Sequence, residues 1–174
     1  SSVTGMKHML DIVSQVHEQA DGTGFPQGLR LHETRYEAVV LNAADTYLTL
    51  TEPDSNRRMV QSDAVLYLIH HTSKGKFCPK IIQSMIRGMS VYPVGTVVLL
   101  DDDSRAVVVR ANEDAPTKPV VRTLDSNPQR IDLMQSNRTI MGPYISNDSG
   151  VKRLSKSDMP QILWGLPKNE AMQA

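Results

Sequence analysis

A glycine-rich stretch near the N-terminus carries the residue types best suited to chemistry in this chain of 174 residues. The stretch runs from His17 to Leu29 and reads HEQADGTGFPQGL. His17 and Asp21 stand four residues apart, where a predicted helix gives way to a loop, so their side chains can face one point. The glycines allow the loop backbone to come close to a ligand and to present its N–H groups to a phosphate. An imidazole with a carboxylate suits Fe, Mn or Zn better than Ca or Mg.

The alternative for this stretch needs no ligand. Asp21 can simply cap the loop, because Asp-Gly turns are stable on their own and short motifs match by chance. The residue types leave both interpretations open.

A second candidate is Asp45, which lies among small apolar residues in the middle of an otherwise apolar predicted helix. A buried carboxylate is costly unless it is paired or bound to a metal. Asn42 lies about one turn away, so the two residues can form a polar notch on the helix. The helical phase equally allows Asp45 to face solvent.

The remaining polar candidates have ordinary structural explanations. Arg57 and Arg58 follow a helix-ending turn and could hold a phosphate, but paired arginines also occur on solvated surfaces. Adjacent residues on a helix point about 100° apart, so His70 and His71 are interpreted as structural residues at a helix C-terminus. Cys78 has no neighbouring base and is interpreted as a small buried apolar residue.

Helical periodicity dominates the first half of the chain and β-branched runs dominate the second. The pattern predicts helices over residues 6–16, 34–50, 62–70 and 79–88, with Ser62 as the N-cap of the third. Strands are predicted over residues 96–100, 106–109 and 118–124. The expected fold is therefore mainly α with a small appended antiparallel sheet of three or four strands, an α+β class.

Composition excludes several classes of protein. Hydrophobic residues make up 40% and charged residues 22%, which is ordinary for a soluble domain. The formal net charge is zero, so nothing favours nucleic acid or an anionic membrane. No apolar run approaches the roughly 20 residues needed to span a bilayer. With one cysteine and no secretory signal at its start, the chain is expected to be cytoplasmic.

Three segments in the same order resemble the HD-GYP family of bacterial signalling domains. Residues 17–29 resemble its signature, His-His-Glu-x-x-Asp-Gly-x-Gly-Tyr-Pro followed by Gly-Leu. Residues 39–47, VVLNAADTY, resemble its Ile-Leu-x-Val-Ala-Asp-x-Tyr segment. Residues 92–98, YPVGTVV, resemble the Tyr-Pro-x-Gly-Thr-x-Val that opens its small β extension, and the whole likeness spans residues 9–124.

The resemblance implies a helical domain that holds iron or manganese ions and hydrolyses cyclic-di-GMP. By residue, it makes His17 the second histidine of the signature and Asp45 a late aspartate ligand of the metals. It makes Arg57 or Arg58 a phosphate contact. The ligand loop that it implies comprises Asp21, Gly22, Gly24, Phe25 and Pro26. The Gly24-Phe25-Pro26 part of this loop is also implied to contact GGDEF partner domains.

Departures from the family pattern are as informative as the matches. Val16 stands where the first histidine is expected, and Phe25 replaces the tyrosine. The His-Asp pair of the family belongs upstream of the signature, beyond the residues of this chain. We therefore expect a degenerate, non-catalytic domain without a bound cofactor, which acts in cyclic-di-GMP signalling by binding the nucleotide or a protein partner. The alternatives are a fragment of an active metal-dependent phosphodiesterase and an interaction domain without a ligand.

The resemblance also suggests a division of the chain. Residues 1–90 are expected to form a partial HD-GYP-like helical domain, residues 91–145 a small β extension, and residues 146–174 a tail with a short docking segment. Without the family's upstream helices, Met9, Val13 and Val16 are expected to lie partly exposed, which favours a homodimer or docking to another chain.

Overall fold

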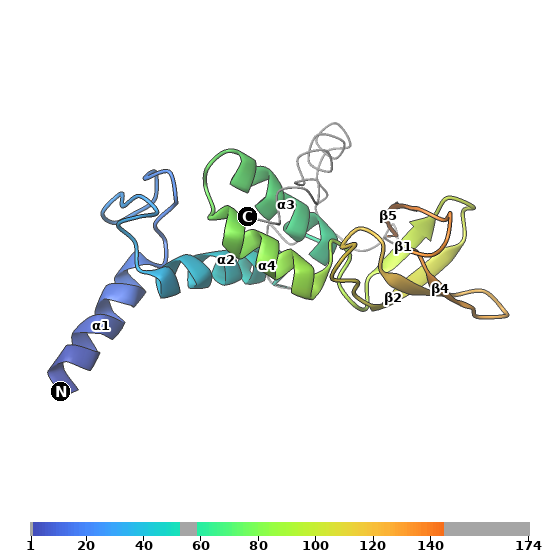
Figure 1. The fold of residues 1–174 in the computed structure, drawn as a ribbon, viewed down its shortest axis with the longest axis horizontal. Coiled ribbons are helices and arrows are strands. Elements are labelled where there is room, and N and C mark those ends of the chain that lie inside the picture. The colour runs from blue at the N-terminus through green and yellow to red at the C-terminus, as the bar shows by residue number, and fades with distance from the viewer. Residues whose placement is uncertain (1, 53–58, 145–174) are drawn as a thin grey trace.

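The structure of the protein, a computed structural model, describes residues 2–52 and 59–144 as four helices followed by five strands (Figure 1). None of the described helices has the length and apolar character to span a bilayer. The predicted α+β class is confirmed. The elements are α1 (Ser2–Gln15), α2 (Tyr36–Thr51), α3 (Gln61–Ser73), α4 (Pro79–Met89), β1 (Val97–Leu100), β2 (Arg105–Arg110), β3 (Val120–Thr123), β4 (Arg130–Asp132) and β5 (Ile140–Pro143).

The helices begin and end close to the predicted residues, with one error in the capping of α3. Pro79 occupies the start of α4, where its missing N–H costs nothing. Ser62 does not cap α3, because the N-cap residue is Val60 and makes no side-chain hydrogen bond. Just before α3, the N–H of Met59 donates to the carbonyl of Leu50 at 2.6 Å. This bond ties the segment to the end of α2, and Ser62 lies buried in the first turn of α3.

The sheet is antiparallel throughout and has the strand order β4-β3-β2-β1-β5. The sheet contains five strands, one more than the three or four that were expected. The unexpected strands, β4 and β5, are three and four residues long. Neither segment contains a run of β-branched residues like those of β1 to β3, and β5 includes Gly142 and Pro143, residue types that are depleted in strands. Along β1 and β2 buried side chains alternate with more exposed ones, so one face of the sheet points towards the core.

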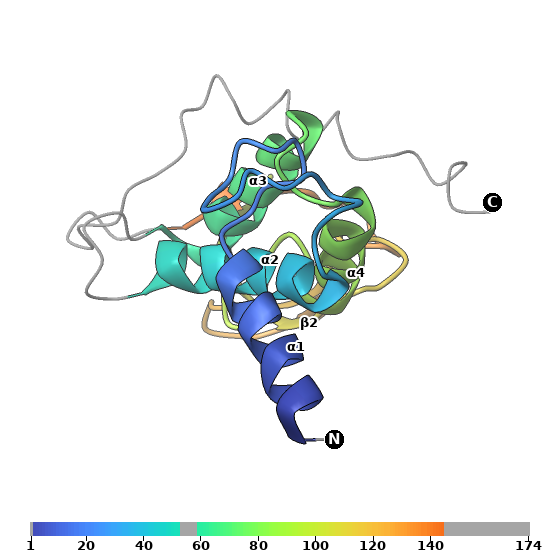
Figure 2. The same ribbon diagram turned by 90° about the vertical axis from the view of Figure 1, so that its left-hand side faces the viewer.

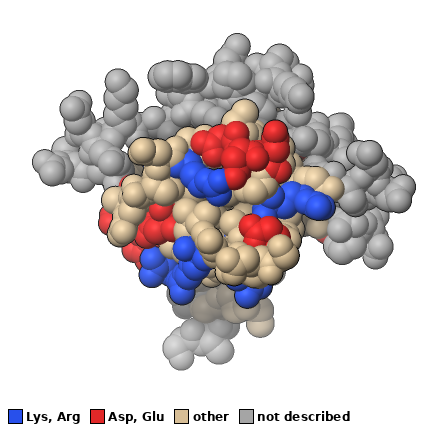
Figure 3. Space-filling model, turned by 90° about the vertical axis from the view of Figure 1, so that its right-hand side faces the viewer, with Lys and Arg blue, Asp and Glu red and all other residues tan. Residues whose placement is uncertain are grey.

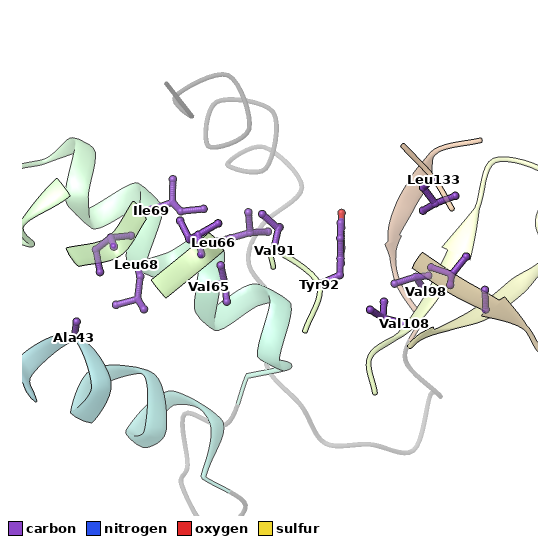
Figure 4. Close-up of a cluster of buried hydrophobic side chains, with 14 of the residues drawn as sticks. Ala43, Val65, Leu66, Leu68, Ile69, Val91, Tyr92, Val98, Val108 and Leu133 are labelled. Carbon is purple, nitrogen blue, oxygen red and sulfur yellow. The ribbon is translucent and has the colours of Figure 1, made fainter. Parts of the chain in front are cut away.

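One hydrophobic cluster joins the helices to the sheet (Figure 4). Leu66 of α3 and Val98 of β1 are both completely buried members of it. Figure 4 shows the ring of Tyr92 between the helical side chains and those of the sheet. The division of the chain at residue 90 stays a prediction, and residues 146–174 lie outside the described residues.

Helix α1 projects from the rest of the molecule (Figures 1 and 2). Polar side chains of α1 contact the start of α2. The Asp11 carboxylate lies 3.4 Å from the guanidinium of Arg35, and His8 lies 3.7 Å from Glu37. The apolar stripe faces solvent, with Met9 64% and Val13 67% exposed. The expected exposure of these two side chains is confirmed, and Val16 is half-buried.

The shared core predicts a large effect for Leu66→Ala. Deleting a fully buried leucine side chain typically costs about 2–5 kcal/mol, because it removes apolar contacts and leaves a cavity. Leu48→Ala is the matched control, since Leu48 on α2 is 63% exposed and surface changes usually stay within about 0.5 kcal/mol. Urea unfolding of both variants measures the difference. Equal losses of stability would contradict this packing.

Candidate functional site

The glycine-rich loop is held closed by the carboxylate of Glu18. Glu18 is only 4% exposed, although it carries a charge. One of its oxygens accepts hydrogen bonds from the N–H groups of Gln27 at 2.6 Å and Gly28 at 3.2 Å. The other accepts from the N–H of Leu29 at 2.9 Å. Bonds from N–H groups to an ionised oxygen are about twice as strong as neutral ones. Three of them compensate for removing this carboxylate from water.

Close approach of the backbone explains why the loop contains glycines. A Cβ atom at Gly24 would lie 2.3 Å from the nitrogen of Gln19 and 2.5 Å from the Cα of Glu18. These are backbone atoms that cannot move aside, so only glycine fits. Gly22 has a φ of +82°, a left-handed conformation that side chains disfavour. The loop therefore folds back tightly on the residues that precede it.

Asp21 points into the loop itself, not towards a common point with His17. Its carboxylate accepts hydrogen bonds from the N–H of Thr23 at 3.0 Å and from the hydroxyl of Thr23 at 2.7 Å. The ammonium of Lys76, from the segment between α3 and α4, lies 3.2 Å from its second oxygen. The side-chain and backbone bonds from Thr23, with a smaller contribution from Lys76, hold the pKa of Asp21 below its usual value. The loop-capping interpretation of Asp21 is therefore the one that the structure supports.

Phe25 is the exposed feature of the loop. Its ring is 63% exposed and stacks on the imidazole of His17, with ring centroids 5.0 Å apart and an angle of 22° between the planes. The N–H of Phe25 donates to the carbonyl of His17 at 3.2 Å, which keeps the two residues together. Beneath the loop the packing leaves a cavity of only about 10 Å³, too small for more than one water molecule. A ligand larger than water does not fit this cavity.

The predicted metal ligands are not brought into a metal site by the described part of the chain. His17 and Asp45 are both exposed, His17 beside Phe25 and Asp45 on α2. Within residues 2–52 and 59–144 no three His, Cys, Asp or Glu side chains form a group that could hold a metal ion. Catalytic sites normally use at least three protein ligands, so these residues alone do not fit an iron or manganese ion. The metal roles of His17 and Asp45 stay predictions.

Of the other candidates, Asn42 joins α2 to the start of the loop. Its amide donates to the carbonyl of Val16 at 2.6 Å, which explains a polar residue at this position of α2. Arg57 and Arg58 lie outside the described residues.

His71 packs against the preceding turn of α3. It stacks on Tyr67 with ring centroids 3.8 Å apart, and burial lowers its pKa. The carbonyl of Tyr67 lies 2.9 Å from its Nδ1 and acts against this shift. The lowered pKa favours the neutral form of His71 at the end of α3.

Glu18 and Lys76 are the functional residues that sequence reasoning missed. Glu18 lies inside the recognised signature, but nothing in the sequence indicated that its carboxylate is buried and accepts backbone hydrogen bonds. Lys76 is 55 residues beyond Asp21 in the chain, so no local pattern connects the two. Its carbonyl also accepts from the N–H of Ala20 at 2.9 Å, which ties the α3–α4 segment to the loop.

Comparison with known proteins identifies the class of domain. Residues 1–81 match the family model described as HD domain. Together with the two relatives below, this match supports an HD-GYP-type family for the helical part of the chain, at low sequence identity.

The relatives are two curated bacterial proteins. A cyclic di-GMP phosphodiesterase of Borreliella burgdorferi is 25% identical over 146 residues, which are 84% of this chain and 38% of the relative. A cyclic di-GMP phosphodiesterase of Pseudomonas aeruginosa is 23% identical over 127 residues, 73% of this chain and 30% of the relative. The chain thus spans about a third of the length of each. No solved structure matches it significantly.

The loop geometry predicts that Glu18→Gln destabilises the protein. The new amide NH₂ would face N–H donors, so at least one buried group would lose its partner, at a cost of about 1–3 kcal/mol. Denaturant unfolding measures the loss, and amide hydrogen exchange should quicken at Gln27, Gly28 and Leu29. Glu113→Gln, on an exposed glutamate, should change stability by less than about 0.5 kcal/mol. Unchanged exchange at the three amides would contradict the role of Glu18.

The lowered pKa of Asp21 predicts a pH dependence of folding. Because the unfolded chain binds this proton more readily, the contribution of Asp21 is complete above the ordinary pKa of 3.8. It is lost as the pH falls through the lower pKa of the folded state. Unfolding midpoints measured from pH 7 down to the acid limit should therefore fall less steeply for Asp21→Asn than for the wild type. Identical curves for Asp21→Asn and the wild type would refute the prediction.

Proposed function

We propose that this chain is a degenerate HD-GYP-type domain that binds cyclic-di-GMP without hydrolysing it and acts in cyclic-di-GMP signalling. The observation that carries the proposal is the closed loop itself. Glu18 holds the shape of the loop, and the loop presents the stacked rings of Phe25 and His17 to solvent. Base stacking on aromatic side chains contributes about 1–3 kcal/mol per base in nucleic-acid binding. Guanine rings of the dinucleotide suit this surface.

Two features support binding without hydrolysis. Val16, which cannot bind a metal, occupies the place of the first histidine of the signature. The described residues also lack a group of three metal-binding side chains. Lys76 contributes positive charge beside the loop, but its ammonium already lies 3.2 Å from Asp21. Its part in binding a phosphate is therefore secondary to stacking.

The second candidate is a part of an active metal-dependent phosphodiesterase. It is supported by the two relatives, which carry that activity in their names, and by the third of their length that the chain spans. In that case, further residues of a longer protein would complete the metal site. For the same loop we propose a protein interaction as well, the contact with a GGDEF partner domain through Gly24, Phe25 and Pro26.

Calorimetric titration with cyclic-di-GMP, in buffer with Mn²⁺ and with chromatographic analysis of products, tests both candidates. We expect micromolar binding with no linear dinucleotide or GMP formed. Phe25→Ala should weaken binding about fivefold, the loss that one aromatic contact of about 1 kcal/mol implies. Tyr36→Ala, which removes another exposed aromatic ring, should leave binding unchanged.

The outcomes separate the candidates. Absence of heat at high micromolar nucleotide refutes binding, and equal affinity of the Phe25→Ala variant refutes the stacking surface. Product formation together with stoichiometric iron or manganese by elemental analysis establishes the second candidate instead.

A further inference from the structure

The face of the sheet that points away from the core, called the outer face here, carries an unusual set of side chains. Burial alternates along β1 and most of β2, and the strand registers bring their less buried members beside Arg122, the exposed residue of β3. The outer face comprises Val97 and Leu99 of β1, Arg105 and Val107 of β2, Arg122 of β3, and Arg130 and Asp132 of β4.

Two arginines lie directly opposite each other on this face. Arg122 of β3 pairs with Arg130 of β4, and both are exposed. The adjacent N–H of Thr123 donates to the carbonyl of Gln129 at 2.9 Å. Since hydrogen-bonded and non-bonded pairs alternate in antiparallel strands, the two arginines form a non-bonded pair, in which side chains come closest. Like charges placed directly opposite each other destabilise a sheet.

The surrounding charges do not neutralise this pair. Arg105 and Arg110 bring the arginines on and beside the outer face to four. Among the described strand residues of the outer face, the acidic one is Asp132. Its carboxylate lies 3.8 Å from the guanidinium of Arg110, so it is not free to neutralise the arginine pair. Arg105 lies over the ring of Tyr144, 5.1 Å from its centroid, so its charge meets no carboxylate there. A repulsive pair is therefore retained on a locally positive surface.

Aliphatic side chains separate the arginines. In the register, Val107 lies beside Arg122 and Val97 beside Val107. Leu124, which is half-exposed, donates its N–H to the carbonyl of Arg105 at 2.8 Å and so lies next to it. Guanidinium groups bind carboxylates through two parallel hydrogen bonds, and arginine is enriched in protein interfaces. The surface thus matches a segment in which acidic and apolar side chains alternate.

From this complementarity we infer that the outer face is a docking surface for an acidic, amphipathic peptide segment of a partner protein. A nucleic acid would need an extended positive field, and the chain has a net charge of zero. Figure 3 shows the sheet-bearing end of the molecule with acidic and basic groups in separate small patches, not one basic field. Arg122 and Arg130 would each hold a carboxylate of the partner, and this contact would offset their mutual repulsion.

Fluorescence anisotropy with the 174-residue chain and a short fluorescein-labelled peptide of alternating Glu and Leu tests the inference. Arg130→Glu should weaken binding about tenfold or more, since it replaces an attractive contact with a repulsive one. The same change should raise the thermal unfolding midpoint, because Glu opposite Arg122 turns repulsion into attraction. Loss of binding with a gain of stability cannot come from unfolding. Lys80→Glu at the start of α4 is the matched control, with the same charge change away from the sheet, and should bind as the wild type does.

Four results would overturn the inference. The first is no binding at high micromolar chain, and the second is unchanged binding by Arg130→Glu. The third is equal binding of a control peptide with Lys in place of Glu. The fourth is displacement of the peptide by cyclic-di-GMP or by vesicles of anionic phospholipid, which would assign the face to a nucleotide or to a membrane. Because the first three results are obtained without metal or nucleotide, they leave the proposed function untouched.

Discussion

The carboxylate of Glu18 determines the shape of the loop, since it gathers three consecutive backbone amides that would otherwise need water. A charge this deeply buried is tolerable only when its oxygens are fully occupied. The rest of the loop adapts to that anchor. Gly24 passes against the backbone of Glu18, and Phe25 is left on the outside. The exposed position of Phe25 thus follows from an internal hydrogen-bond network beneath it.

A second polar network fastens this loop to the body of the domain. Asp21, Thr23 and Lys76 form it, and Lys76 belongs to the segment between α3 and α4. That segment leads into α4, and α4 packs on the cluster shared with the sheet. The loop, the helices and the sheet are therefore mechanically continuous. A ligand at Phe25 and a partner on the outer face would bind to opposite parts of one connected structure (Figure 1).

The helices and three of the strands could be predicted from the sequence because each buries several side chains at a regular period. Strands β4 and β5 could not, since they form only against β3 and β1 and have little pattern of their own. The loop was recognised from its glycines, but the contacts of its charged side chains could not be predicted. The partner of Asp21 is Lys76, and no local rule relates residues so far apart. Ser62 has the residue type of a cap, yet tertiary packing around Met59 decided where α3 begins.

Helix α1 exposes its apolar stripe to solvent, and this has a consequence for how the chain resists proteases. Its attachment to the start of α2 consists mainly of exposed polar contacts. The ion pair of Asp11 with Arg35 contributes at most about 1 kcal/mol. The side chain of Gln15 accepts a hydrogen bond from the N–H of Arg35 at 2.8 Å, and His8 lies 3.7 Å from Glu37. No buried apolar side chain of α1 secures it among the described residues. Cleavage after Lys7 should therefore precede cleavage after Arg87 in α4, a helix that packs on the shared core. Whatever covers the apolar stripe of α1 would protect the bond after Lys7, so digestion reports on occupancy of this surface.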